Sequence, residues 1–208
     1  MNWATIASLA TAGGTLVLAV STFASVRSAN RAARAAERSL QAGLRPLLVP
    51  SRLDDGDQKV YFAGGQHVMV PGGQAIVTEQ SGAILLTISL RNAGSGLAVM
   101  HGWRFYRYDI HGDMRPEPED FTGQSRDLYV PAGDAGFWQG AFRDPADPGY
   151  QAAQQAIKER DVLTIDLLYG DFEGGQRVIT RFILRPGREN ILISSAIRHW
   201  NVDRSDPR

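Results

Sequence analysis

Two patterns of hydrophobic and polar positions divide the chain. The residues from Trp3 to Val26 include no charged side chain, and apolar residues are mixed there with small ones. Beyond Pro46, apolar and polar residues alternate over several segments, which is the pattern of β-strands with one buried face. We therefore expect an apolar N-terminal helix followed by a β-rich domain.

The alternation is clearest in four segments that carry apolar residues at every second position. They predict strands at residues 84–90, 163–169, 178–185 and 191–200. Weaker patterns predict further strands at residues 47–50, 60–63, 75–79, 98–108, 128–130 and 137–142. One helix is expected at residues 148–160, with Asp147 as its N-cap and Pro148 at its first position. Many short strands with a single helix predict an all-β domain, an antiparallel sandwich rather than a barrel.

The uncharged N-terminal run is long enough to cross a membrane. As a helix it extends roughly 36 Å, against a hydrocarbon core of about 30 Å. A cleaved signal peptide is the competing interpretation, but such a peptide carries basic residues ahead of a short apolar core. No basic residue precedes this run, so we expect a retained anchor at residues 1–26. One face of this helix carries a stripe of small residues: Ser8, Ala12, Thr15, Ala19 and Thr22. Such a stripe would allow two copies to pair as a homo-oligomer through this helix, although it also arises by chance in alanine-rich helices.

Residues 27–45 predict a basic helical neck that connects the anchor to the β-domain at residues 46–208. Alanines favour a helix there, Gly43 suits its C-cap, and Pro46 ends it. Four arginines spaced four, three and four residues apart share one face, where they can contact anionic membrane lipids: Arg27, Arg31, Arg34 and Arg38. Basic flanks stay on the cytoplasmic side, so we expect a single-pass cell-membrane protein with a cytoplasmic C-terminal domain.

Composition excludes several classes of site. The chain has no cysteine, and therefore no disulfide, thiol nucleophile or thiolate metal site. Its 22 basic and 22 acidic residues balance. Because the basic residues are concentrated in the neck, the β-domain is mildly acidic, which argues against nucleic-acid binding.

Two turn motifs resemble those of a known family. One motif is Asn92-Ala93-Gly94-Ser95-Gly96, and we interpret its residues as tolerant of positive φ. This motif resembles the Asn-x-Gly-x-Gly corner between two strands of bacterial immunoglobulin-like domains. Val130-Pro131-Ala132-Gly133-Asp134 resembles the Pro-Gly-Asp/Glu turn that precedes a strand in the same domains. With its span, its Arg/Ala neck and Arg45-Pro46, the chain is similar to uncharacterised bacterial single-pass membrane proteins with an immunoglobulin-like β-sandwich domain. The resemblance implies that fold and no catalytic residue.

Histidines offer the only sequence basis for a metal-dependent enzyme. His101 and His111 lie at opposite ends of one predicted strand, and Asp109 and Asp113 flank His111. A straight strand of this length places its ends about 30 Å apart, so the two imidazoles are not expected to share an ion. The sequence also lacks the familiar hydrolase and phosphate-loop signatures. We predict no catalytic residue, no metal site and no cofactor.

Two acidic turns are expected to be exposed to solvent and to bind no ion. Residues 54–57 resemble the start of a calcium loop, but Phe62 stands where an EF-hand has its glutamate. Asp171 and Glu173 could act as an acid and base pair, yet carboxylates in a glycine-rich turn are usually exposed.

Aromatic residues suggest a binding surface. Trp103, Tyr106 and Tyr108 lie on one predicted strand, on both of its faces, and an exposed aromatic patch marks a partner site. Packing of the tyrosines at a sheet edge or under the helix is the alternative. The leading hypothesis is a non-catalytic, membrane-anchored binding or scaffold domain for another membrane or cytoplasmic protein. The alternatives are a membrane-associated hydrolase or metal-dependent enzyme using His111 and neighbouring carboxylates, and a ligand sensor.

Overall fold

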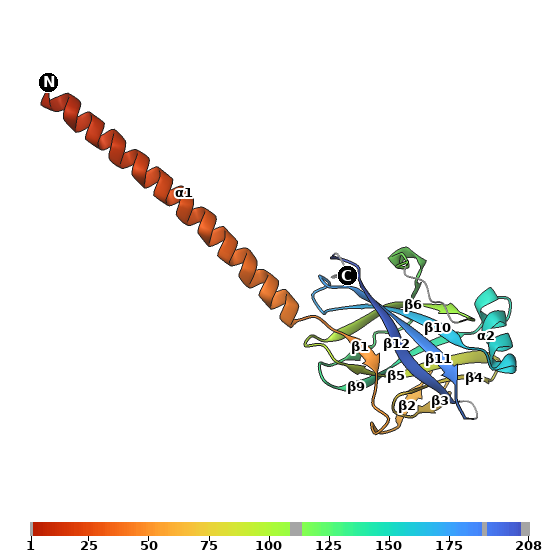
Figure 1. Ribbon diagram of the computed structural model, residues 1–208. Helices are drawn as coiled ribbons and strands as arrows, with labels where there is room; N and C mark the ends of the chain where they lie inside the picture. Colours follow the sequence, from red (N-terminus) through yellow and green to blue (C-terminus); the bar gives the residue numbers. More distant parts are fainter. Residues whose placement is uncertain (1, 109–113, 189–190, 205–208) are drawn as a thin grey trace. The chain divides into compact units, whose positions relative to one another are not determined.

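The computed structural model describes residues 2–108, 114–188 and 191–204. It divides into two compact units, Met1–Ala42 and Gly43–Arg208. The first unit is a single helix, and the second is a β-domain with one α-helix (Figure 1).

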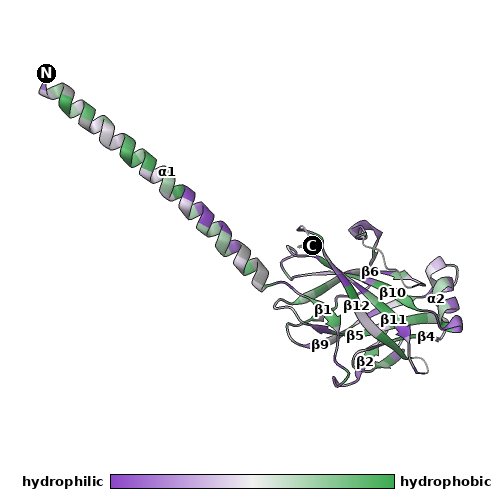
Figure 2. Cartoon of the chain, in the orientation of Figure 1, coloured by the Kyte–Doolittle hydropathy of each residue, from purple (hydrophilic) through white to green (hydrophobic). Residues whose placement is uncertain are grey.

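Helix α1 runs without interruption from Trp3 to Gly43, so the expected anchor and neck are parts of one helix. Its segment Ile6–Glu37 is long and apolar enough to cross a membrane, and none of the apolar window is buried against other parts of the protein. Figure 2 shows the apolar first half and the hydrophilic band that follows it. Hydroxyl groups in the apolar half donate to the carbonyl four residues earlier at 2.8–2.9 Å: Thr11, Thr15, Ser21 and Thr22.

The β-domain contains all of the predicted strands and two more, β3 and β7. The strands are β1 (Leu48–Pro50), β2 (Gln58–Tyr61), β3 (His67–Val70), β4 (Gln74–Gln80), β5 (Ala83–Asn92), β6 (Ala98–Tyr106), β7 (Thr122–Gly123), β8 (Tyr129–Val130), β9 (Ala135–Phe142), β10 (Leu163–Gly170), β11 (Val178–Pro186) and β12 (Ile191–Asn201). A 3-10 turn, η1, covers Pro118–Asp120. Helix α2 covers Pro148–Glu159, and its predicted N-cap is confirmed because the Asp147 side chain accepts a hydrogen bond from the amide of Gly149.

Ten strands form one antiparallel sheet, and β2 and β3 form a separate hairpin. The main path runs β1-β5-β4-β12-β11-β10-β6-β7, with β9 on the second edge of β5 and β8 also paired to β6. The predicted antiparallel β-architecture is thus confirmed. Its hydrogen-bonded ladders join the ten strands into a single continuous sheet.

The sheet curls around one hydrophobic core. Strands β6 and β9 lie far apart along the ladder path, yet the rings of Trp103 and Trp138 from these strands meet with centroids 5.4 Å apart. Helix α2 adds Tyr150, Ala153 and Ala156 to the same core. On the other face, the β2–β3 hairpin packs on β4, β5 and β9 and forms a second, smaller core.

The corner between β5 and β6 holds the start of the β-domain. Asn92 is fully buried, and its side-chain oxygen accepts hydrogen bonds from the amides of Leu47 and Gly94 at 3.1 and 3.0 Å. A Cβ at Gly94 would lie 2.3 Å from the Arg45 carbonyl oxygen, and one at Gly96 only 1.7 Å from that of Leu44. Neither glycine has positive φ, so the expected reason for these glycines is wrong. They are required because two backbones approach closely.

Candidate binding groove

One edge of β9 is open. The strand pairs along its full length with β5, and no strand in the described part of the chain pairs with its second edge. The main-chain carbonyl of Gln139 faces that open side, because it accepts a hydrogen bond from the side-chain amide of Gln124 at 2.8 Å. β9 contains no charged residue and no proline, the usual means by which an edge strand avoids pairing.

Gln124 bridges the gap between the two ends of the curled sheet. Its backbone amide donates to the carbonyl of His101 on β6 at 3.0 Å. Its side-chain oxygen accepts from the Trp138 indole at 3.3 Å, while its side-chain nitrogen reaches Gln139 on β9. A side-chain carboxamide therefore spans a place where a neighbouring strand would supply peptide groups.

A groove opens at this gap. Its volume is about 620 Å³. We call it the β9 groove; it is lined by Phe62, Ala63, Trp103, Thr122, Gly123, Gln124, Ser125, Arg126, Gln139, Gly140, Ala141, Phe142, Arg143, Asp144 and Asp147. The end of β9 with the residues after it lines the groove, and so do β7 and the segment that follows it.

The floor of the β9 groove is aromatic. The Trp103 ring packs edge-on against Phe142 with centroids 5.1 Å apart, and Phe142 also meets Phe105 at 5.5 Å. A Cβ at Gly140 would lie 2.7 Å from the ring of Trp138, so glycine is needed for these rings to pack over the strand. Trp103 belongs to the main core, and Phe142 and Phe105 pack against that core, so the floor is continuous with the close-packed interior.

Charged residues lie at the rim. Arg126 donates to the side-chain oxygen of Gln139 at 3.2 Å. The two carboxylates are engaged by main-chain amides: Asp144 accepts from Ala146 at 2.9 Å and Asp147 from Gly149 at 2.7 Å. These contacts position the chain that leads into α2. Because the two carboxylates already accept main-chain hydrogen bonds, the aromatic floor and the β9 edge are the features of the groove that are suited to binding.

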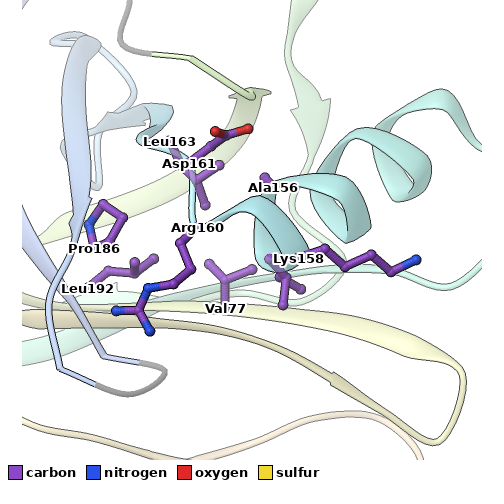
Figure 3. Close-up of a pocket in the computed structure, with 9 residues that line it drawn as sticks. Val77, Ala156, Lys158, Arg160, Asp161, Leu163, Pro186 and Leu192 are labelled. Carbon is purple, nitrogen blue, oxygen red and sulfur yellow. The ribbon is translucent and has the colours of Figure 1, made fainter.

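A second, smaller pocket lies at the C-terminal end of α2 (Figure 3). Its volume is about 260 Å³, and Val77, Leu163 and Leu192 give it apolar walls. Its charged groups are directed elsewhere: Arg160 donates to the carbonyl of Gly187 at 2.7 Å, and Asp161 accepts from Arg107 at 2.6 Å. Figure 3 shows the ammonium group of Lys158 pointing away from the pocket. The pocket therefore presents aliphatic stems and few convergent polar groups.

The three aromatic residues predicted as a binding surface do not share a surface. Trp103 is 5% exposed and belongs to the core and to the groove floor. Tyr106 is half-buried on the opposite face of β6, where Arg104 lies 5.0 Å from its ring centroid. Burial raises the pKa of the Tyr106 hydroxyl. Tyr108 follows the strand and is exposed, with Arg107 over its ring.

Of the predicted lipid-contacting arginines, Arg27, Arg31 and Arg34 are exposed on α1. The side chain of Arg38 lies outside the described part of the structure. His111, Asp109 and Asp113 also lie outside the described residues. Within residues 2–108, 114–188 and 191–204, no three His, Asp or Glu side chains are grouped so as to hold a metal ion.

The acidic turns have structural partners. In the loop at residues 54–57, hydrogen bonds from the Arg91 side chain, with a further one from the Arg52 amide, lower the pKa of Asp55. Asp171 is buried, which corrects the expectation of an exposed carboxylate. Its side chain accepts from the amides of Gly175 and Gln176 and so shapes the turn between β10 and β11.

Sequence reasoning missed Gln124, Gln139 and Gly140. One signal was available: β9 is an uncharged segment of Ala135–Phe142 with two glycines, which is unusual for a protected edge strand. Its position at the open end of the sheet depends on pairing that no local pattern reports. No protein-family model, curated protein or solved structure matches this chain. Its function is therefore argued from geometry.

Proposed function

We propose that the chain is a membrane-anchored, non-catalytic binding domain for a protein partner, with the β9 groove as its binding site. The observation that carries the proposal is the open edge of β9 above an aromatic floor. Binding sites in proteins combine such an apolar, desolvated centre with a polar rim. Arg126 and Arg143 supply that rim here.

The character of α1 supports membrane anchoring. Its apolar window is unburied, and four of its hydroxyls, those of Thr11, Thr15, Ser21 and Thr22, donate to carbonyls of the same helix, as hydrocarbon requires. The uninterrupted helix also far exceeds the 7–15 apolar residues of a signal-peptide core. We propose a cell-membrane protein whose arginines at 27, 31 and 34 contact anionic lipids and keep the C-terminal domain cytoplasmic. Pairing of two α1 helices is a further part of this proposal.

The immunoglobulin-like assignment is also a proposal. It is supported by the packing of the two family-like turns on each other: the amide of Asn92 donates to the carbonyl of Asp134 at 3.0 Å, and that of Gly133 donates to the carbonyl of Asn92 at 2.9 Å. A fold assignment carries no activity by itself, so the binding proposal does not depend on it.

Site-directed photo-crosslinking tests the binding site in native membranes. Benzoylphenylalanine at Ser125, an exposed residue of the groove wall, is expected to give a discrete cross-linked species. The same residue at Met69, which is 45% exposed and does not line the groove, is the control. Equal cross-linking from both positions, or none from Ser125, contradicts the groove as the binding site.

Cysteine labelling tests the topology, and the natural absence of cysteine makes single labels unambiguous. A membrane-impermeant maleimide added to intact cells is expected to label Asn2→Cys and to reach Ser125→Cys only after lysis. Labelling of Ser125→Cys in intact cells would reverse the orientation. If alkaline carbonate releases the protein from membranes, α1 is not a membrane anchor and that part of the proposal is wrong.

A further inference from the structure

We infer that the β9 groove binds an extended peptide by β-strand addition, in which the peptide pairs with the open edge of β9. This inference rests on the proposed function and names the chemical class of the partner. Main-chain hydrogen bonds supply the affinity in such complexes, and pockets for alternate side chains supply selectivity.

The geometry of β9 assigns the hydrogen-bonding groups. In an antiparallel strand, the N–H and C=O of one residue point to the same side, and successive residues alternate sides. The Gln139 carbonyl faces the groove, so the N–H and C=O of Ala141 face it as well. Within the described part of the chain, neither Gln139 nor Ala141 has a main-chain partner on that side. From Gln139 to Phe142, where β9 ends, the edge accommodates about four residues of a partner strand.

Gln124 identifies the chemistry of the occupant. Its carboxamide is a side-chain equivalent of a peptide group: the NH2 donates to the Gln139 carbonyl, as the N–H of a paired strand does, and the C=O accepts from Trp138. An incoming peptide replaces this single amide with a ladder. Gln124 is therefore an internal competitor of the peptide. While the groove is empty, its side chain supplies the hydrogen bond to the Gln139 carbonyl.

The occupant that we infer is a linear peptide and not a second folded sheet. Besides the β9 edge, the groove is lined by β7 and the segment after it, so an occupant of this edge also contacts that segment. The edge strand of another copy brings its whole sheet with it, whereas a linear peptide adds one strand alone, and we therefore take the peptide as the occupant. An extended peptide fits, with one apolar side chain directed at Trp103 and Phe142.

The test uses the full chain in lipid nanodiscs and a phage-displayed library of random linear octapeptides. Selected peptides are resynthesised and their Kd is measured by fluorescence anisotropy. N-methylation of the peptide, one residue at a time, is expected to weaken binding by about tenfold at every second position and to leave the positions between unchanged. Insensitivity to N-methylation, or sensitivity without this period of two, overturns the inference. So does a library that yields no groove-dependent binder.

Two variants locate the peptide. Gln124→Ala removes the internal competitor and is expected to tighten binding several-fold, whereas a merely structural role of Gln124 predicts weaker binding. Ala141→Pro removes an N–H that faces the groove and leaves the ladder with β5 intact, so binding is expected to fall about tenfold. Unchanged affinity in both variants contradicts the assignment. If cross-linking from Ser125 persists while no linear peptide binds, the strand-addition inference fails and the proposed binding function stands.

Discussion

The side-chain amide of Asn92 donates a hydrogen bond to the carbonyl oxygen of Val130 at 3.0 Å, although 38 residues separate them. The same nitrogen donates to the carbonyl of Gly96 at 2.7 Å, and the side-chain oxygen accepts from Leu47 and Gly94. One buried side chain thus connects the residue before β1, the β5–β6 corner and β8. The two turn motifs that are separate in the sequence form one structural unit around Asn92.

Replacement of Asn92 removes this unit's central connection. Asn92→Ala leaves two buried carbonyls and two amides without a side-chain partner, so we expect the free energy of unfolding to fall by about 3 kcal/mol or more. Asn92→Asp retains the acceptors, loses both donors and buries a charge, so it is also expected to destabilise at neutral pH. Urea unfolding followed by tryptophan fluorescence measures both. Stability within 1 kcal/mol of wild type in Asn92→Ala would show that water replaces the lost bonds.

Gly96→Ala tests the close approach of two backbones. The new Cβ would lie 1.7 Å from the carbonyl oxygen of Leu44, so the chain from Leu44 to β1 must shift. The amides of Leu47 and Leu48, which donate to Asn92 and Tyr169, are expected to exchange with solvent deuterium faster than in wild type. Gly175→Ala is the matched control, because its Cβ meets nothing within 4 Å. Equal protection in the two variants would contradict the requirement for glycine at the corner.

Substitutions at the buried ion pair between Asp166 and Arg181 are expected to have non-additive effects on the free energy of unfolding. Its two hydrogen bonds are both 2.7 Å, and the side chains are 0% and 3% exposed. Arg181→Met leaves a buried carboxylate unpaired, so it is expected to cost about 3–5 kcal/mol. The double variant Asp166→Leu/Arg181→Met removes both charges and is expected to recover most of that loss. A double-mutant cycle by urea unfolding measures the coupling, and additive losses would contradict it.

Acid stability should depend on Asp55. Hydrogen bonds from Arg91 and from the Arg52 amide hold the pKa of Asp55 below its ordinary value of 3.8. A carboxylate with a lowered folded-state pKa contributes stability above the unfolded value and loses it as pH falls through the folded value. The stability difference between wild type and Asp55→Asn is therefore expected to be complete at neutral pH and to shrink below pH 3.8. Asp57→Asn, exposed in the same loop, is the control, and a pH-independent difference would contradict the prediction.

Local patterns predicted much of the secondary structure. The period of two located β5, β10, β11 and β12 because each strand has a face in the core. The cap of α2 at Asp147 was also predictable, since a carboxylate next to proline at a helix start is a local chemical arrangement. β7 was missed because two residues show no period at all.

Buried polar residues were the hardest to interpret from sequence. Asp171 was expected to be exposed, yet it is 6% exposed and shapes a turn. Trp103 and Tyr106 share a strand and lie on opposite faces of it, as the alternation predicts, but only the structure shows that Trp103 is in the core. The sequence shows which residue types are present, whereas the partner that makes burial of a polar group favourable comes from a distant segment.

By itself, the sequence determined an uncharged helix of membrane-spanning length and a domain of short antiparallel strands. The first follows from a long run without charge and the second from side-chain periodicity, and both are local properties of the chain. Only the tertiary structure decided that the sheet curls, that β9 keeps one edge open, and that Gln124 occupies the gap beside it. Alternation records which face of a strand is buried, but the pairing of its edges depends on main-chain hydrogen bonds to distant segments, and every sequence offers the same main-chain groups.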